Sequence, residues 1–281
     1  MSRALVLGGG GVTGIAWELG ILKGLRDSGV DLTGADTIIG TSAGSVVGTQ
    51  LSTGLDLDEL YDEQIRPVDT SEYKSLGAGK LDKRTLVRMV SLMVMPGNGE
   101  VKRQRLGRAS IKAHPEAPTD RMRVMRTRIG DPEWPERDLR ITAVNAHTGA
   151  FVIFDRSSGV PLIEAVAASC SVPLIWPPVP IGEATYIDGG ARSVANADQA
   201  TGFATVIVIA PIAQAVSRRH SLSAQLTRTG AAHTASVVPD KAARNAIGPN
   251  LLDPGRRAAA AEAGAAQGRG LAERIGSVWQ A

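Results

Sequence analysis

The chain lacks the features that mark several classes of protein. Its 281 residues include one cysteine, Cys170, so no disulfide can form within the chain. No run of about 18 apolar residues is present, so we expect no transmembrane helix. The apolar run near the start is too short for a signal peptide and has no cleavage-like segment. We therefore expect a cytoplasmic protein, with peripheral contact to a membrane left open.

Aromatic residues are few, and the net charge is small. Aromatics make up 4% of the chain, and the net charge of +3 is mild, so we expect no nucleic-acid partner. Hydrophobic residues make up 43% and charged residues 21%, which is typical of a globular protein with a sizeable core. We expect a single domain over residues 1–281, and the sequence does not indicate an oligomeric state.

The first fifty residues predict the opening of a parallel α/β sheet. A short buried strand at residues 4–7 leads into a glycine loop at 8–11 and a helix at 15–28 with helical apolar spacing. A second strand at 37–39 then runs through a tight turn into a helix at 45–53. Alternating strands and helices of this kind are typical of right-handed crossovers in a parallel sheet.

The remaining segments predict a sheet core interrupted by an insertion. Strands are expected at 139–145, 150–155, 184–187 and 203–210, and helices at 161–169 and 253–280. Residues 55–135 contain helical patterns but no clear strand, so we interpret them as a helical cap inserted between sheet-core segments 4–54 and 138–210. Residues 212–250 could not be assigned, and the helix at 253–280 is expected to pack on the sheet.

The predicted cap has an apolar stripe and an excess of positive charge. The stripe is interpreted as interior packing and consists of Leu86, Met89, Val90 and Met93, with Val94 and Met95. Residues 101–128 include nine basic residues and only two acids, Glu116 and Asp120. The basic residues are Lys102, Arg103, Arg105, Arg108, Lys112, Arg121, Arg123, Arg126 and Arg128. A surface facing anionic lipid headgroups and a solvated helix face both explain this excess.

The tight turn at residues 40–44 has the sequence GTSAG, which fits the nucleophile elbow G-x-S-x-G. A sharp strand-to-helix turn lifts the hydroxyl of Ser42 clear of the backbone, and Gly40 and Gly44 remove side chains that would clash there. The helix that follows directs its N-terminal N–H groups at the site, which favours negative charge.

Two further motifs accompany the elbow. Residues 9–14 (GGGVTG) fit G-x-G-x-x-G between a strand and a helix. Residues 188–190 (DGG) follow a predicted strand and are preceded by ASCSVP at 168–173. In this order and spacing, the motifs over residues 4–210 resemble the patatin-like phospholipase family.

This resemblance implies a three-layer α/β/α sandwich that hydrolyses acyl esters of lipids. It implies that Ser42 is the nucleophile and Asp188 the general base, and that no metal or organic cofactor is needed. The backbone N–H groups of the glycine loop would form the oxyanion hole, at Gly9, Gly10, Gly11 and Val12. The motifs would be supported by Gly14, Gly40, Gly44, Gly189 and Gly190. The family usually has Arg or Lys at the position of Thr13, so neutral lipid esters stay as plausible as phospholipids.

Two other protein classes share parts of these motifs. A dinucleotide-binding domain would need an acid at the end of the second strand, where this chain has the elbow. A Ser–His–Asp hydrolase would use Ser42, Asp188 and either His220 or His233, although we expect all four histidines to be surface or turn residues.

A binding module without activity would have no need of both Ser42 and Asp188. Asp198 is the second candidate for the acid, interpreted as a loop or helix-cap residue. Cys170 is expected to be buried and inert.

Overall fold

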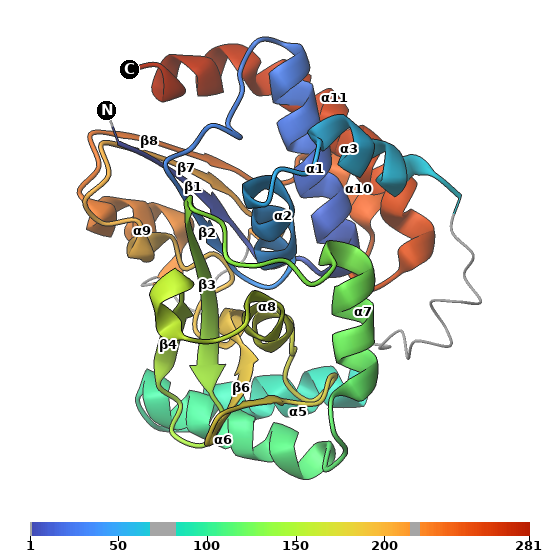
Figure 1. Ribbon diagram of the computed structural model, residues 1–281, viewed down its shortest axis with the longest axis vertical. Coiled ribbons are helices and arrows are strands. Elements are labelled where there is room, and N and C mark those ends of the chain that lie inside the picture. Colours follow the sequence, from blue (N-terminus) through green and yellow to red (C-terminus); the bar gives the residue numbers. More distant parts are fainter. Residues whose placement is uncertain (1, 68–82, 214–219) are drawn as a thin grey trace.

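A mostly parallel sheet forms the centre of the molecule (Figure 1). The computed structural model describes residues 2–67, 83–213 and 220–281. Within them, eight strands lie in the order β5-β6-β3-β2-β1-β7-β8, with β4 paired to β3. Their bounds are β1 (Arg3–Leu7), β2 (Thr37–Gly40), β3 (Asp138–Asn145), β4 (Phe151–Phe154), β5 (Val179–Ile181), β6 (Ala184–Asp188), β7 (Thr205–Ile209) and β8 (His233–Val237).

The five strands from β3 to β8 along this order are parallel, whereas β4, β5 and β6 pair antiparallel. Helices on both faces complete the α/β fold, so the predicted fold class is confirmed. The helices are α1 (Gly11–Asp27), α2 (Ala43–Ser52), α3 (Leu57–Ile65), α5 (Lys83–Val94), α6 (Gly99–Ala113), α7 (Thr119–Ile129), α8 (Leu162–Ser169), α9 (Leu222–Thr229), α10 (Lys241–Ile247) and α11 (Arg257–Trp279).

The two faces of the sheet follow from the alternation of side chains along each strand. On β1, Leu5 and Leu7 belong to the larger core cluster, which includes residues of α1, α2 and α8. Ala4 and Val6 point to the other face and pack in a smaller cluster with residues near α9. Because both faces are covered, β1 is apolar at nearly every position rather than alternating with polar residues.

Helix α11 packs along α1, as the adjacent blue and red helices in Figure 1 show. Glycines on both helices permit this close approach. A Cβ on Gly20 would lie 2.2 Å from the carbonyl oxygen of Ala261, and one on Gly268 would lie 2.5 Å from that of Ile21. The prediction that the C-terminal helix packs on the sheet was therefore incomplete, because its main partner is α1.

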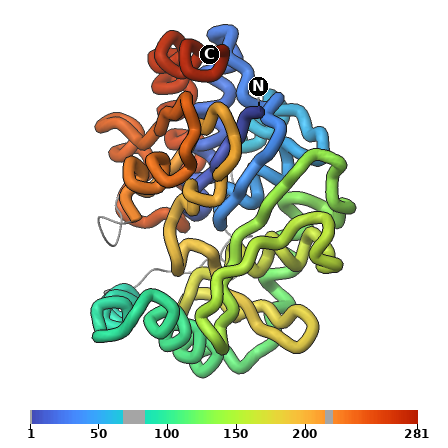
Figure 2. The backbone as a smooth tube through the Cα atoms, turned by 90° about the vertical axis from the view of Figure 1, so that its left-hand side faces the viewer, coloured from blue at the N-terminus to red at the C-terminus, as the bar shows by residue number. Residues whose placement is uncertain are grey.

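Four described helices, α3, α5, α6 and α7, lie between α2 and β3. They fall within the predicted insertion at 55–135, of which residues 68–82 lie outside the described part of the chain. Helices α5 and α6 lie side by side at the end of the molecule opposite both termini (Figures 1 and 2). The interpretation of the α5 stripe as interior packing was wrong, because Leu86 and Val90 are 40% and 50% exposed.

Several elements escaped the sequence analysis. The unassigned region 212–250 contains α9, β8 and α10, and β5 lies between the predicted helix at 161–169 and the predicted strand at 184–187. No helix among the described residues is long and apolar enough to cross a bilayer. The single domain over 1–281 and the cytoplasmic location stay predictions.

Candidate active site

The predicted nucleophile, Ser42, lies at a strained turn between β2 and α2. Its φ of 53° and ψ of −114° are unfavourable for a residue with a Cβ. Glycines make the turn possible, because a Cβ on Gly44 would lie 2.2 Å from the carbonyl oxygen of Leu7. A Cβ on Gly40 would lie 2.6 Å from the carbonyl oxygen of Gly44. Helix α2 therefore approaches β1 and β2 closely, as the elbow motif predicts.

Hydrogen bonds from α8 and α2 hold the backbone of Ser42 in this conformation. The Ser42 N–H donates to Oγ of Ser169 at 2.9 Å. The Ser42 carbonyl oxygen accepts from Oγ of Ser45 at 2.6 Å and from Sγ of Cys170 at 3.3 Å. Burial raises the pKa of the Cys170 thiol, which keeps the proton that this contact requires. Cys170 therefore braces the turn.

The predicted base, Asp188, ends β6 and pairs across the sheet with Ala143 of β3. The Gly190 N–H donates to its carboxylate at 2.7 Å, and a hydrogen-bonding interaction with the nearby Ser42 side chain lowers the pKa of Asp188. Burial raises the pKa of Asp188 from 3.8 to about 6, although these hydrogen bonds and the charge of Arg121 oppose the rise. Asp188 is thus a proton acceptor near neutral pH that already contacts the serine.

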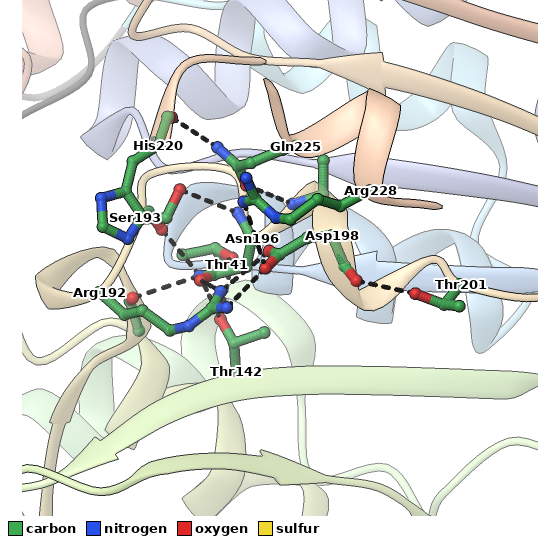
Figure 3. Close-up of polar contacts among 12 residues, drawn as sticks. Thr41, Thr142, Arg192, Ser193, Asn196, Asp198, Thr201, His220, Gln225 and Arg228 are labelled. Atoms are coloured by element: carbon green, nitrogen blue, oxygen red, sulfur yellow. Dashed lines mark hydrogen bonds and ion pairs between the residues drawn. The ribbon is translucent and has the colours of Figure 1, made fainter. Parts of the chain in front are cut away.

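A buried amide, Asn196, connects the elbow to the loop that follows Asp188 (Figure 3). Its Nδ2 lies 3.1 Å from Oγ1 of Thr41, which precedes the serine, and 3.4 Å from Oγ1 of Thr142 on β3. The same nitrogen lies 3.2 Å from the carbonyl oxygen of Gly189 and 2.7 Å from that of Ser193. One side chain therefore positions the segments that contain the predicted nucleophile and base relative to each other.

The glycine loop after β1 presents backbone N–H groups at the same edge of the sheet. The Gly9 N–H donates to the carbonyl oxygen of Val194 at 2.7 Å, so Gly9 is not a free donor and the predicted set requires this correction. The N–H groups of Gly10, Gly11 and Val12 have no acceptor within the described residues. Gly11 has a φ of 62°, which favours glycine.

The neighbouring residues anchor this loop. Thr13 is buried, and both its N–H and its Oγ1 contact the carbonyl oxygen of Leu251, at 3.1 and 3.3 Å. The Gly14 N–H donates to the carbonyl oxygen of Gly10 at 2.9 Å, and a Cβ on Gly10 would lie 2.5 Å from Pro211. Thr13 therefore fixes the first turn of α1 and adds no charge to the site.

Among the described residues of the cap, Arg121 on α7 is a buried cation. Its Nη2 donates to the carbonyl oxygen of Cys170 at 2.9 Å, and its guanidinium lies 4.7 Å from the ring centroid of Trp176. Burial lowers the pKa of Arg121 to about 10, and the charge of Asp188 acts in the opposite direction. A positive charge therefore lies close enough to the predicted base to influence its proton affinity.

Other sequence candidates lie elsewhere. His233 begins β8 and pairs with Thr205 at the amino end of β7, whereas Ser42 lies beyond the carboxyl end of β2. Asp198, which we expected in a loop or at a helix cap, lies in a short 3-10 helix between β6 and β7 and pairs with Arg192 at 2.6 Å and with Arg228 at 3.4 Å. Among the described residues, no three His, Cys, Asp or Glu side chains form a group that could hold a metal ion.

Sequence reasoning missed three side chains that support the site. Ser169 lies in the ASCSVP segment, but its contact with the Ser42 backbone depends on how α8 packs. Arg121 was one of nine basic residues, with nothing local to distinguish it. Asn196 adopts a left-handed conformation, with φ of 51°, in which asparagine is common, yet its partners are distant in sequence.

Comparisons with known proteins address the family and the fold. The chain matches the family model described as patatin-like phospholipase over residues 5–201. No curated protein sequence matches it. Among solved structures, VipD from Legionella pneumophila has a TM-score of 0.50 at 13% identity, over 97% of this chain and 67% of that one. This likeness concerns the fold alone.

A chain in the heterodimeric ExoU–SpcU complex of the type III secretion system of Pseudomonas aeruginosa has a TM-score of 0.48 at 19% identity. The match covers 100% of this chain but only 52% of that one, so the present chain spans about half its length. The family model matches well over half of the chain and includes all three motifs. The chain therefore belongs to the patatin-like phospholipase family.

Proposed function

We propose that this protein is a serine hydrolase that cleaves carboxylic esters of lipids through an acyl-enzyme on Ser42. The observation that supports this most directly is the contact between the strained Ser42 and Asp188. Members of the matched family are in general ester hydrolases. A serine hydroxyl needs a base within hydrogen-bond reach before it attacks an ester, and Asp188 meets that requirement.

In the first half-reaction, Oγ of Ser42 attacks the carbonyl carbon of the ester while its proton passes to Asp188. The tetrahedral intermediate collapses as the bond to the alcohol breaks, and Asp188 returns the proton to the departing oxygen. In the second half-reaction, a water molecule attacks the acyl-enzyme and gives its proton to Asp188. That proton then returns to Ser42 as the fatty acid leaves.

Stabilisation of the oxyanion is assigned to the N–H groups of Gly10, Gly11 and Val12. Because they open α1, the helix dipole adds to their attraction for negative charge. Loss of one such donor typically costs roughly 3 kcal/mol of transition-state stabilisation. The chemistry requires no metal or organic cofactor.

Two alternatives make different predictions. In a Ser–His–Asp triad the imidazole lies between serine and carboxylate, and the interaction between the Ser42 and Asp188 side chains favours a dyad without it. A binding module without activity would not need a raised pKa at Asp188. Replacing His220 or His233 by alanine is therefore expected to keep turnover within about tenfold of wild type, whereas loss of a triad base costs far more.

The test is covalent labelling combined with turnover. A fluorophosphonate should modify Ser42 alone, as mapped by mass spectrometry of peptides, and Ser42→Ala should lose both the label and ester hydrolysis. Ser277→Ala, at an exposed serine of α11, is the matched control and should keep both. A label on another serine would contradict the elbow assignment. Lipid binding without turnover on any ester, over graded chain lengths and phospholipids, would favour the binding module.

A further inference from the structure

Exposed hydrophobic side chains are concentrated on α5. Among the described residues, seven large hydrophobic side chains are exposed, and five of them lie on or directly after this helix. The five are Leu86 (40% exposed), Val87 (67%), Val90 (50%), Val94 (69%) and Met95 (44%), which we call the α5 apolar surface. The other two, Leu55 and Ile65, lie beside or on α3. Exposed apolar side chains that gather in this way mark an interaction site.

The geometry of α5 explains why this surface has no partner within the described chain. Residues of an α-helix advance about 100° each, so Leu86, Val90 and Val94 form one stripe, with Val87 beside it. The half-buried residues, including Met89 and Met93, occupy the face beside α6. The helix thus has two apolar faces, of which the described part of the chain covers one.

Positive charge flanks the apolar stripe. Arg84 and Arg88 are exposed and lie on one side of the stripe, roughly 60° and 100° around the helix from Val87, where their side chains can reach a polar boundary. The adjoining α6 contains one acid, Glu100, and the basic residues Lys102, Arg103, Arg105, Arg108 and Lys112. Within the described residues, no acid forms an ion pair with Arg84, Arg88 or the basic side chains of α6.

We propose that the α5 apolar surface docks on an anionic lipid bilayer. The stripe would enter the boundary between headgroups and acyl chains, while Arg84 and Arg88 meet the anionic headgroups. A helix with an exposed apolar face bordered by basic residues has the chemistry that lies in the plane of such a bilayer. The proposal rests on the lipid hydrolase function, because that function takes its substrate from a lipid surface.

The position of α5 relative to the sheet is consistent with this role. Strand β3 continues past Ile141, the register partner of Gly40, toward α6. At its end, a Cβ on Gly107 of α6 would lie 2.2 Å from the carbonyl oxygen of Ala146. The α5–α6 pair therefore borders the same edge of the sheet as the candidate active site, and both views place it at one end of the molecule (Figures 1 and 2).

Charge also distinguishes a bilayer from a second copy of this chain. In a symmetric dimer the same patch meets itself, so the basic flanks would approach basic flanks. Such like-charge contacts oppose association unless acids intervene, and α5 contains none. An anionic bilayer satisfies the apolar stripe and the basic flanks together.

The experiment is sedimentation with vesicles of phosphatidylcholine alone and of equimolar phosphatidylcholine and phosphatidylglycerol. Wild type should bind the anionic vesicles more tightly, and binding should weaken as salt screens the charges. Substituting Val87, Val90 and Val94 together by serine should weaken this binding at least about tenfold, because apolar area no longer enters the lipid. Serine at Leu55 and Ile65 is the matched control and should leave binding unchanged.

A second variant tests the charges separately. Glutamine at Arg84 and Arg88 should weaken binding to anionic vesicles about thirtyfold, since each of the two basic side chains near such a surface contributes about 1 kcal/mol. It should also flatten the salt dependence. Equal binding of wild type to both kinds of vesicle, or no loss in the valine variant, would overturn the proposal.

Two controls separate this proposal from the proposed function. All α5 variants should hydrolyse a water-soluble short-chain ester at the wild-type rate, whereas Ser42→Ala should lose turnover and still bind vesicles. If wild type hydrolyses no ester, the proposed hydrolase function is wrong, and the vesicle experiment still tests the docking of the α5 apolar surface. If light scattering shows an oligomeric wild type and a monomeric valine variant, the surface is a subunit interface and the lipid proposal fails.

Discussion

The guanidinium of Arg121 donates a hydrogen bond to the carbonyl oxygen of Cys170 at 2.9 Å. Cys170 in turn donates from Sγ to the carbonyl oxygen of Ser42 at 3.3 Å. A helix of the predicted cap is thus connected through two contacts to the residue at the strained turn. The Arg121 charge also lies near Asp188 and opposes the rise in its pKa. Arg121 therefore combines a positional and an electrostatic influence on the site.

Removing the charge of Arg121 should move the pH dependence of turnover. In Arg121→Gln, the positive charge that lowers the pKa of Asp188 is gone, so this pKa should rise. The acidic limb of the pH profile of kcat/KM should then shift to higher pH. Arg121→Lys should shift it less. Arg126→Gln, at an exposed position on the same helix, is the control and should leave the profile unchanged. A purely structural Arg121 would lower the rate without moving the limb.

The wild-type rate should follow the ionisation of Asp188. The base must be deprotonated to accept the Ser42 proton, so kcat/KM on a soluble ester should rise with pH through about 6 and then level off. An ordinary exposed aspartate would place this limb about two units lower. A rate that stays constant well below pH 6 would contradict the assignment of Asp188 as base.

Asp188→Asn should stabilise the fold while abolishing most turnover. Burial raises the pKa of Asp188 above its ordinary 3.8 to about 6, so its ionisation destabilises the folded state as pH rises between these values. The free-energy cost of ionising Asp188 in the folded state is fully present above pH 6. It is absent below 3.8, the pKa of this group in the unfolded chain. The variant should therefore gain about 3 kcal/mol of unfolding free energy at neutral pH, with the gain vanishing in acid.

The measurement for this variant is denaturant unfolding of both proteins across the pH range. Turnover should fall by roughly two to four orders of magnitude, the usual contribution of a general base. A double variant with Ser42→Ala should fall little further than either single change, because residues that act as one unit are not additive. Near-full activity of Asp188→Asn would show that the base lies elsewhere.

Asn196→Ala should cost both stability and activity. The change removes a buried amide that contacts Thr41 and Gly189, leaving polar groups unsatisfied, and alanine tolerates the left-handed backbone poorly. We expect a loss of about 2 to 4 kcal/mol by denaturant unfolding. Asn245→Ala, at an exposed position, should change stability little. A variant as stable and active as wild type would contradict the positioning role of Asn196.

Gly44→Ala should disrupt the elbow. Its Cβ would lie 2.2 Å from the carbonyl oxygen of Leu7, so α2 would have to move away from β1 and displace Ser42. Gly270→Ala, where a Cβ meets nothing within 4 Å in α11, is the control. It should stabilise the protein by up to about 1 kcal/mol through helix propensity. Thermal unfolding and ester turnover of both variants test this contrast.

Local patterns were enough to predict the opening of the fold and its motifs. The run at Arg3–Leu7, the glycine loop and the apolar spacing of α1 are properties of adjacent residues, so the sequence alone indicated them. The order of the three motifs likewise identified the family, which the comparison confirmed over residues 5–201. The predicted helix at 15–28 began four residues later than α1 (Gly11–Asp27), because the first turn of α1 contains glycines that were assigned to the loop motif.

Distant contacts could not be deduced in this way. Apolar spacing on α5 predicted a buried stripe, but periodicity does not reveal whether a partner covers that face, and here none of the described elements does. The sequence does not distinguish Gly9 from the neighbouring glycines, because its N–H is occupied by the carbonyl oxygen of Val194, which is distant in the chain.

The sequence by itself determined which residues could perform the chemistry, because glycine, serine and aspartate motifs depend on local backbone geometry. Only the tertiary structure decided which of them meet. It brought Asp188 from β6 to Ser42 after β2, buried Arg121 beside them and left the α5 apolar surface uncovered. The physical reason is that burial, pKa and contact between segments far apart in the chain depend on packing, which no local pattern encodes.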